Sequence, residues 1–214
     1  MNAVLIGATG LIGNELLNSL LEDNRYNKVI ALTRKPLQPH AKLENHLIKF
    51  DVMEEYSKLC VGDHFYCALG TTIKQAGSKE YFYRVDYSYV YEFAKIAKQH
   101  LAERFLIVSS QGANAASSIF YPKVKGEIEA AIKELGLVST SIFRPSLLLG
   151  NRKEYRSGEE FGKKMMSVIS FLIPLKYKPI HASVVASAMI NAAFNQAEKN
   201  KIYESDEIQE LGKA

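Results

Sequence analysis

Three polar residues in the middle of the chain have the types and spacing needed to give a proton to a reacting oxygen. Tyr121 and Lys125 are four residues apart, so on a helix they share one face. Pro122 suits a first helical turn, which predicts that Tyr121 stands where a helix begins. A nearby ammonium makes a phenol easier to ionise. Ser110 follows a strand-like run and could hydrogen-bond a carbonyl oxygen, so the three would form a general acid with an oxyanion partner.

The Tyr–Lys spacing alone has little specificity, because the chain has 12 tyrosines and a second pair at the same spacing, Tyr91 and Lys95. Position separates the two pairs. Tyr91 lies inside a long predicted helix, where an aromatic side chain more often serves packing. Tyr121 follows the strand-like "FLIVSS" and opens a helix. Whether Ser109 or Ser110 faces the site stays open, since it depends on the register of that strand.

A glycine-rich turn near the N-terminus forms a second candidate site. In "VLIGATGLIG" three glycines at three-residue spacing join a strand-like run to an amphipathic helix. The first permits a tight turn, the second lets a ligand approach the backbone, and the third lets the helix pack on the sheet. Amides at the start of that helix would face a pyrophosphate; the alternative is a structural turn without a ligand. The expected contacts of a dinucleotide are Gly7, Thr9, Gly10, Leu11, Ile12 and Gly13.

The end of the second strand-like run indicates which dinucleotide is bound. Sites for NAD carry an acidic residue here that holds the ribose hydroxyls, but this chain has Thr33, Arg34 and Lys35 in "VIALTRKP". A guanidinium can hold a 2′-phosphate, so Arg34 and Lys35 favour NADP(H) over NAD(H). The alternative is that both cations are simply solvated.

Apolar runs of strand length alternate with helical patterns through most of the 214 residues. This alternation predicts one α/β domain over residues 1–214, with a parallel sheet covered on both faces. We expect strands over residues 3–6, 28–32, 46–50, 64–69, 104–108 and 138–143. We expect helices over residues 11–22, 79–100, 121–135, 159–173 and 182–196. The last stretch, "ESDEIQELGKA", is polar and is predicted to be a surface end.

The order of these motifs resembles the atypical branch of the short-chain dehydrogenase/reductase superfamily. The resemblance spans residues 3–150 and rests on "GATGLIG", "FDVMEEY", "FYCALGTT", "YRVDY", "FLIVSSQGA", "YPKVKGEIE" and "FRPSLLLG", which look most like the small Tat-interacting-protein-like oxidoreductases. It implies a Rossmann-type, doubly wound parallel sheet of about seven strands, with NADP(H) bound at its carboxyl edge. It also implies NADPH-dependent hydride transfer to a small carbonyl-type substrate, catalysed by Ser110, Tyr121 and Lys125.

The same resemblance implies further cofactor contacts, with Asp51 and Val52 by the adenine. Those under the adenosine ribose would be Ala68, Leu69, Gly70 and Thr71. Pro145 and Ser146 would lie beside the nicotinamide end, and Ser109, Tyr121 and Lys125 complete the expected set of cofactor contacts. Asp86 stands where many relatives carry Asn, so this chain brings a charge to that position.

Composition narrows the classes of partner. The net charge is +4, with cations and anions interspersed, which does not favour nucleic acid. The five histidines and the two cysteines show no metal-ligand spacing, and so few thiols suit a reducing cytoplasm. No stretch resembles a signal peptide or is long enough to span a bilayer. We expect a cytoplasmic protein with a small-molecule substrate and without metal, nucleic acid or membrane; a homodimer through the tyrosine-rich helix stays open.

Residues 151–180 are expected to form a small lid over the substrate, with the apolar stretch Met165–Leu175 as its wall. A helix lying on a membrane surface is the alternative for that stretch. Two other functions also stay open. One is a regulatory protein that binds NADP(H) with little turnover. The other is a nucleotide-sugar epimerase or dehydratase, although those usually carry a larger C-terminal substrate domain than the short stretch after Gly150 allows.

Overall fold

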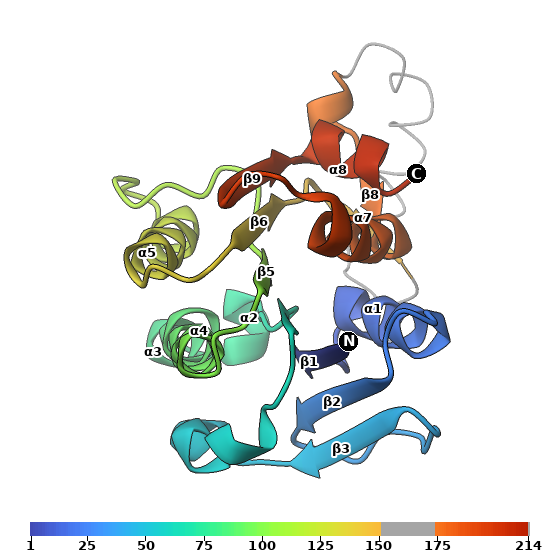
Figure 1. Cartoon of the computed structure of the whole chain (residues 1–214). Helices are drawn as coiled ribbons and strands as arrows, with labels where there is room; N and C mark the ends of the chain where they lie inside the picture. The colour runs from blue at the N-terminus through green and yellow to red at the C-terminus, as the bar shows by residue number, and fades with distance from the viewer. Residues whose placement is uncertain (151–173, 214) are drawn as a thin grey trace.

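A seven-stranded sheet runs through the centre of the molecule, with every neighbouring pair parallel (Figure 1). The computed structural model describes residues 1–150 and 174–213. The strand order is β3-β2-β1-β4-β5-β6-β9, so the direction of winding reverses between β1 and β4. The strands are β1 (Asn2–Ile6), β2 (Lys28–Thr33), β3 (Leu43–Leu47), β4 (His64–Cys67), β5 (Arg104–Val108), β6 (Thr140–Arg144) and β9 (Asn200–Glu204). A separate short pair joins β7 (Leu148–Leu149) and β8 (Ile180–His181). The predicted Rossmann-type fold is confirmed.

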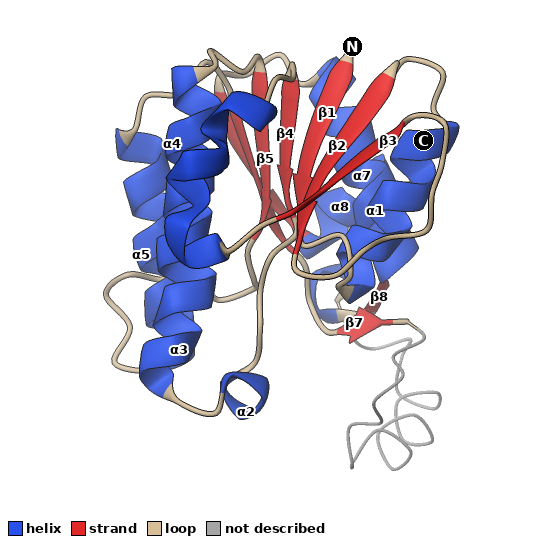
Figure 2. Ribbon diagram, turned by 90° about the horizontal axis from the view of Figure 1, so that it is seen from below, coloured by secondary structure: helices blue, strands red, loops and turns tan. Residues whose placement is uncertain are grey.

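Helices cover both faces of the sheet, as Figure 2 shows. One layer consists of α1 (Leu11–Glu22), α7 (Ala182–Asn195) and α8 (Ser205–Leu211); the other contains η1 (Phe50–Leu59), α3 (Lys79–Tyr83), α4 (Tyr89–Gln99) and α5 (Phe120–Glu134). Along β1, Leu5 packs into the core under α1 and α7, whereas Val4 and Ile6 pack under α4. Central strands buried on both sides need continuous apolar runs, which explains why "AVLI" has no polar alternation.

Several predicted elements are found with the same or nearly the same bounds. The first helix spans Leu11–Glu22 as predicted, and α5 and α7 differ from the prediction by one residue at each affected end. The strand predicted over residues 46–50 is wrong in position, because β3 spans Leu43–Leu47 and Phe50 begins the 3-10 helix η1. Phe50 and Met53 are the buried residues of η1, so their apolar character serves packing beyond the strand.

The long helix predicted over residues 79–100 is interrupted. It consists of α3, a π-helical segment η2 (Arg84–Ser88) and α4. Phe82, Tyr89 and Phe93 are buried, as expected for a face packed on the sheet. Short elements that the sequence did not predict are α2 (Ile73–Ala76) and η3 (Leu175–Tyr177).

The predicted polar surface end is mostly half-buried or exposed, but it also forms a helix with two buried residues, which was not predicted. Residues 200–204 form β9, which pairs with β6 and completes the sheet, and α8 follows at once. A capping box between Glu204 and Glu207 starts α8, and Ser205 and Ile208 are fully buried. The helix predicted over residues 159–173 lies outside the described residues, as do residues 151–173 of the expected lid.

Candidate functional site

A cavity of about 930 Å³ lies at the carboxyl ends of β1, β2 and β4. It adjoins the reversal of strand order between β1 and β4, the place where doubly wound sheets bind ligands. The turn after β1, the ends of β2 and β3, the loop after β4 and the helices α2 to α4 contribute to its wall. The lining residues are Gly7, Thr9, Gly10, Arg34, Ile48, Lys49, Phe50, Asp51, Ala68, Leu69, Gly70, Thr71, Thr72, Lys74, Gln75, Tyr81, Val85 and Tyr89.

The glycine turn is packed backbone to backbone. Gly7 has φ +84°, and a Cβ there would lie 2.4 Å from the carbonyl carbon of Ala68. A Cβ at Gly13 would lie 2.0 Å from the carbonyl oxygen of Gly7, so neither position admits a side chain. Gly10 caps α1 without a side-chain hydrogen bond, which leaves the first-turn amides facing outward for an anion. The turn therefore fits the pyrophosphate of a dinucleotide.

Three cationic side chains line the cavity. Arg34, Lys49 and Lys74 line it and are exposed, while Lys35 is not among the lining residues. The carboxylate that lines the cavity, Asp51, accepts a hydrogen bond from the Tyr89 hydroxyl at 2.6 Å and lies 3.4 Å from an Arg84 nitrogen. Burial and the bond to Asp51 raise the pKa of Tyr89 to about 12, so its hydroxyl acts as the donor. Asp51 is thus held in place by groups of η2 and α4.

Ser110 and the start of α5 lie on adjoining segments. Tyr121 stands in the first turn of α5 as predicted. The amide of Asn114 donates to the Pro122 carbonyl at 2.9 Å, and a Cβ at Gly126 would lie 2.0 Å from the Ala115 nitrogen. The loop after Ser110 is therefore packed against the first turns of α5. The Ser110 hydroxyl is buried and has no hydrogen-bond partner among the described residues, which leaves it available to a ligand atom.

Lys125 connects α5 to the floor of the cavity. Its Nζ lies 2.7 Å from Asp86 Oδ1, and the two side chains are 7% and 0% exposed. Asp86 Oδ2 accepts a hydrogen bond from the Thr71 amide at 2.9 Å. A Cβ at Gly70 would lie 3.7 Å from Lys125 Nζ. Burial lowers the pKa of Lys125, but the attraction of Asp86 outweighs it, and the pKa is raised above its usual value.

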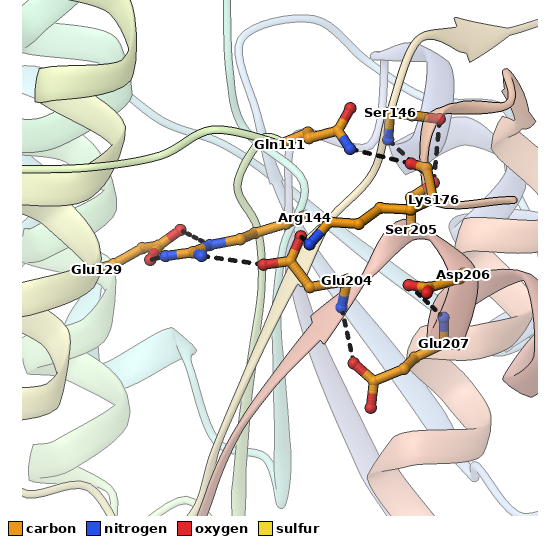
Figure 3. A network of polar contacts seen from close by, with 9 residues as sticks. All are labelled: Gln111, Glu129, Arg144, Ser146, Lys176, Glu204, Ser205, Asp206 and Glu207. Carbon is orange, nitrogen blue, oxygen red and sulfur yellow. Dashed lines mark hydrogen bonds and ion pairs between the residues drawn. The ribbon is translucent and has the colours of Figure 1, made fainter. Parts of the chain in front are cut away.

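Ser109 belongs to a different polar network. Its hydroxyl donates to Glu129 Oε1 at 2.5 Å, and Glu129 also accepts from Arg144. Arg144 bridges to Glu204 at 3.1 Å, so it lies between carboxylates from α5 and β9 (Figure 3). Gln111 donates to the Lys176 carbonyl at 2.9 Å in the same network. The Ser109 hydroxyl is thus used in a hydrogen bond within the protein. Of the two serines, Ser110 is the one whose hydroxyl is available to a ligand.

The structure brings part of the predicted cofactor set together. The predicted contacts that line the cavity are Gly7, Thr9, Gly10, Arg34, Asp51, Ala68, Leu69, Gly70 and Thr71. The predicted contacts outside its lining are Leu11, Ile12, Gly13, Lys35, Val52, Ser109, Tyr121, Lys125 and Pro145. The last four, like Ser110, belong to β5, α5 and β6 or to the loops beside them.

Sequence reasoning missed the contributions of Lys49, Lys74 and Tyr89 to the cavity. A signal existed for the segment that carries Lys74. Thr72 caps α2 by accepting a hydrogen bond from the Gln75 amide at 3.1 Å, and Thr-x-x-Gln is a capping pattern. Lys49 had no such signal, because its place depends on where β3 ends.

Two classes of site are not found in residues 1–150 and 174–213. No cluster of three or more His, Cys, Asp and Glu side chains in this part is arranged to hold a metal ion. No helix there combines the length and the apolar character needed to traverse a bilayer.

Comparison with known proteins gives consistent results. Residues 3–204 match the NAD dependent epimerase/dehydratase family. Protein HTATIP2 of Rattus norvegicus is 33% identical over 98% of this chain and 88% of its own length. Protein FMP52-1, mitochondrial, of Scheffersomyces stipitis is 35% identical over 100% of this chain and 99% of its own length. The enzyme WbmH of Bordetella bronchiseptica, solved in complex with NAD+, has a TM-score of 0.75 at 16% identity, covering 99% of this chain and 79% of that one.

These matches confirm the resemblance expected from the motifs. The mitochondrial name of the fungal relative does not support the cytoplasmic location that we expected. The family match covers the glycine turn, the cavity, Ser110 and the start of α5 in one continuous stretch. The chain belongs to the NAD dependent epimerase/dehydratase family.

Proposed function

We propose that the chain is an NADPH-dependent oxidoreductase that reduces a small carbonyl-type substrate at Ser110, Tyr121 and Lys125. The observation that supports this most is the position of Lys125. Its ammonium is buried beside the backbone of Gly70, which lines the cavity, and it belongs to the helix that Tyr121 opens. One lysine therefore links the cavity that suits a dinucleotide to the tyrosine that suits proton transfer.

The preference for NADP(H) rests on the charges of the cavity. The free amides at the start of α1 suit the pyrophosphate. Arg34 follows β2 where an NAD site would carry a carboxylate, and Lys49 lines the same cavity. A 2′-phosphate held by Arg34 would find a guanidinium fork that matches its geometry.

The chemistry follows from the groups present. A reduced nicotinamide, when bound here, would supply the hydride that the carbonyl carbon accepts. The Ser110 hydroxyl donates a hydrogen bond to the carbonyl oxygen, where negative charge develops. Tyr121 gives its proton to that oxygen, so the carbonyl becomes an alcohol. Lys125 would stabilise the phenolate left on Tyr121 and would hold the nicotinamide ribose hydroxyls.

A second candidate comes from the family match, which covers epimerases and dehydratases. Such an enzyme would return the hydride to its own product, so the amount of reduced cofactor would not change over a turnover. A regulatory protein would bind NADP(H) and consume none. Net NADPH consumption therefore separates the reductase from both alternatives.

The test follows NADPH absorbance over a panel of small carbonyl compounds, with the variant Tyr121→Phe. We expect a roughly 100- to 10,000-fold loss of rate, the usual worth of a general acid. Tyr91→Phe is the matched control, because Tyr91 belongs to the second Tyr–Lys pair but stacks on Tyr87 at 6.0 Å between ring centroids. Its rate should equal that of the wild type. Consumption that survives in Tyr121→Phe, or no consumption by the wild type, would contradict the proposal.

A further inference from the structure

Asp86 lies where a π-helical segment interrupts the helix predicted over residues 79–100. The π-helical segment η2 spans Arg84–Ser88 and has Asp86 at its centre. Such segments are rare and occur frequently at functional sites. Asp86 is 1% exposed, although a charged side chain is almost never buried unless it is paired. A buried carboxylate inside a π turn therefore calls for a partner, and the structure provides two.

The two carboxylate oxygens have separate roles. Oδ2 accepts a hydrogen bond from the Thr71 amide at 2.9 Å. Oδ1 lies 2.7 Å from the Lys125 ammonium, and no amide or hydroxyl of the described residues hydrogen-bonds it. A Cβ at Gly70 would lie 3.3 Å from Oδ1 and 3.7 Å from Nζ. The ion pair thus lies directly beneath the backbone of the loop that lines the cavity.

The charge of Lys125 depends on this carboxylate. Burial without a partner can lower the pKa of a lysine by several units, and burial acts on Lys125 in that direction. The other titratable groups that face the ammonium are Tyr121 on α5 and Cys67 on β4. Burial raises the pKa of the Cys67 thiol to about 12, so this thiol is neutral at physiological pH. Among the described groups around Nζ, Asp86 is the one that brings a full negative charge.

We propose that Asp86 is a positioning residue that keeps the buried Lys125 charged beside Tyr121 and ties that ammonium to the loop under the cofactor. Its effect on catalysis rests on the proposed function, whereas its effect on the charge of Lys125 does not. Asp86→Asn removes the negative charge and little else, because an amide of the same shape can still accept a hydrogen bond from the Thr71 amide. The ammonium would then be buried without a counter-charge.

The direct test is an NMR titration of the protein labelled with ¹³C at the lysine ε-carbons, without cofactor. Lys125→Arg removes one resonance and so assigns it. In the wild type we expect Lys125 to titrate above 10.5, the ordinary value for lysine. In Asp86→Asn we expect its midpoint to fall below that value. A wild-type Lys125 that titrates below 10.5 would overturn the proposal, even if the variant failed to fold.

The second test is the pH dependence of carbonyl reduction. In Asp86→Asn the alkaline limb of kcat should move to lower pH by about one unit or more, as Lys125 loses its proton. Glu129→Gln is the matched control, since Glu129 is 3% exposed and also pairs with a cation. Its partner Arg144 carries a guanidinium that does not deprotonate. Glu129→Gln should therefore lower the free energy of unfolding but leave the alkaline limb of kcat at the same pH. Equal shifts in both variants would refute the role of Asp86. If the wild type consumes no NADPH, the proposed function is contradicted. The NMR titration then still tests whether Asp86 keeps Lys125 charged.

Discussion

Ser109 and Ser110 are consecutive in sequence, yet their hydroxyls have opposite environments. Ser109 donates to Glu129 at 2.5 Å, whereas the buried Ser110 hydroxyl has no hydrogen-bond partner among the described residues. Successive residues at the end of a strand point to opposite sides, and α5 supplies a carboxylate for the first of them. This difference separates a structural serine from a candidate for substrate binding.

Substitution of each serine should therefore have a different result. Ser110→Ala should lower kcat for carbonyl reduction by roughly 100-fold, the usual effect of losing one donor to a developing oxyanion. Its thermal stability should not fall, because the lost hydroxyl made no hydrogen bond. Ser109→Ala should lower the free energy of unfolding by about 1.5–3 kcal/mol, because it removes a buried hydrogen bond to the charged Glu129, which keeps its bonds from Arg144. Chemical denaturation and initial rates of both variants check this, and the reverse assignment would show that Ser109 faces the substrate.

Arg34 should determine the choice between the two nicotinamide cofactors. Arg34→Ala should weaken NADPH binding roughly 10- to 100-fold, the usual worth of charge-assisted hydrogen bonds, and should leave NADH binding nearly unchanged. Lys35→Ala is the control, because Lys35 is adjacent to Arg34 and exposed but is not part of the cavity lining. Fluorescence titration of each variant gives the affinities. If Arg34→Ala weakened the binding of NADPH and NADH equally, the guanidinium would not be in contact with the 2′-phosphate.

His64 should make the stability of the protein depend on pH. It is buried, its Nδ1 lies 2.7 Å from the Tyr26 hydroxyl, and burial lowers its pKa from 6.5 to about 4. Between these two pH values the unfolded chain binds a proton that the folded chain does not, so stability falls as the pH is lowered through this window. The loss attributable to His64 should approach about 3 kcal/mol.

Urea unfolding at several pH values measures this loss. His64→Gln should remove most of the slope between pH 6.5 and about 4, while His181→Gln, at an exposed histidine before α7, should keep it. A slope unchanged in His64→Gln would assign the acid sensitivity to other groups.

The sheet was predictable where strands are buried on both faces. Leu5 and Ile30 belong to continuous apolar runs of strand length, which are typical of a strand buried on both faces. At β3 that signal fails, because the edge strand is only half-buried and its Asn45 side chain donates to the Ala31 carbonyl. The apolar residues that attracted the prediction, Ile48 and Phe50, are buried beyond the strand.

The candidate site was predictable in its local motifs and less so in its long-range pairs. The glycine turn and the Tyr121–Lys125 spacing depend on residues that are close in sequence, so both could be predicted from the sequence alone. The interruption at Asp86 could not, because Phe82, Val85, Tyr89 and Phe93 continue the helical spacing across it. What sets Asp86 apart is its partner Lys125, far along the chain, and a single sequence carries no record of that contact.

Cofactor binding tests the proposed function most directly, because every role assigned to Ser110, Tyr121 and Lys125 requires a nicotinamide beside them. Calorimetric titration of the wild-type protein should show one molecule of NADPH bound per chain, more tightly than NADH. Absence of binding by both nucleotides would contradict the assignment of the cavity, and tighter binding of NADH would contradict the role given to Arg34.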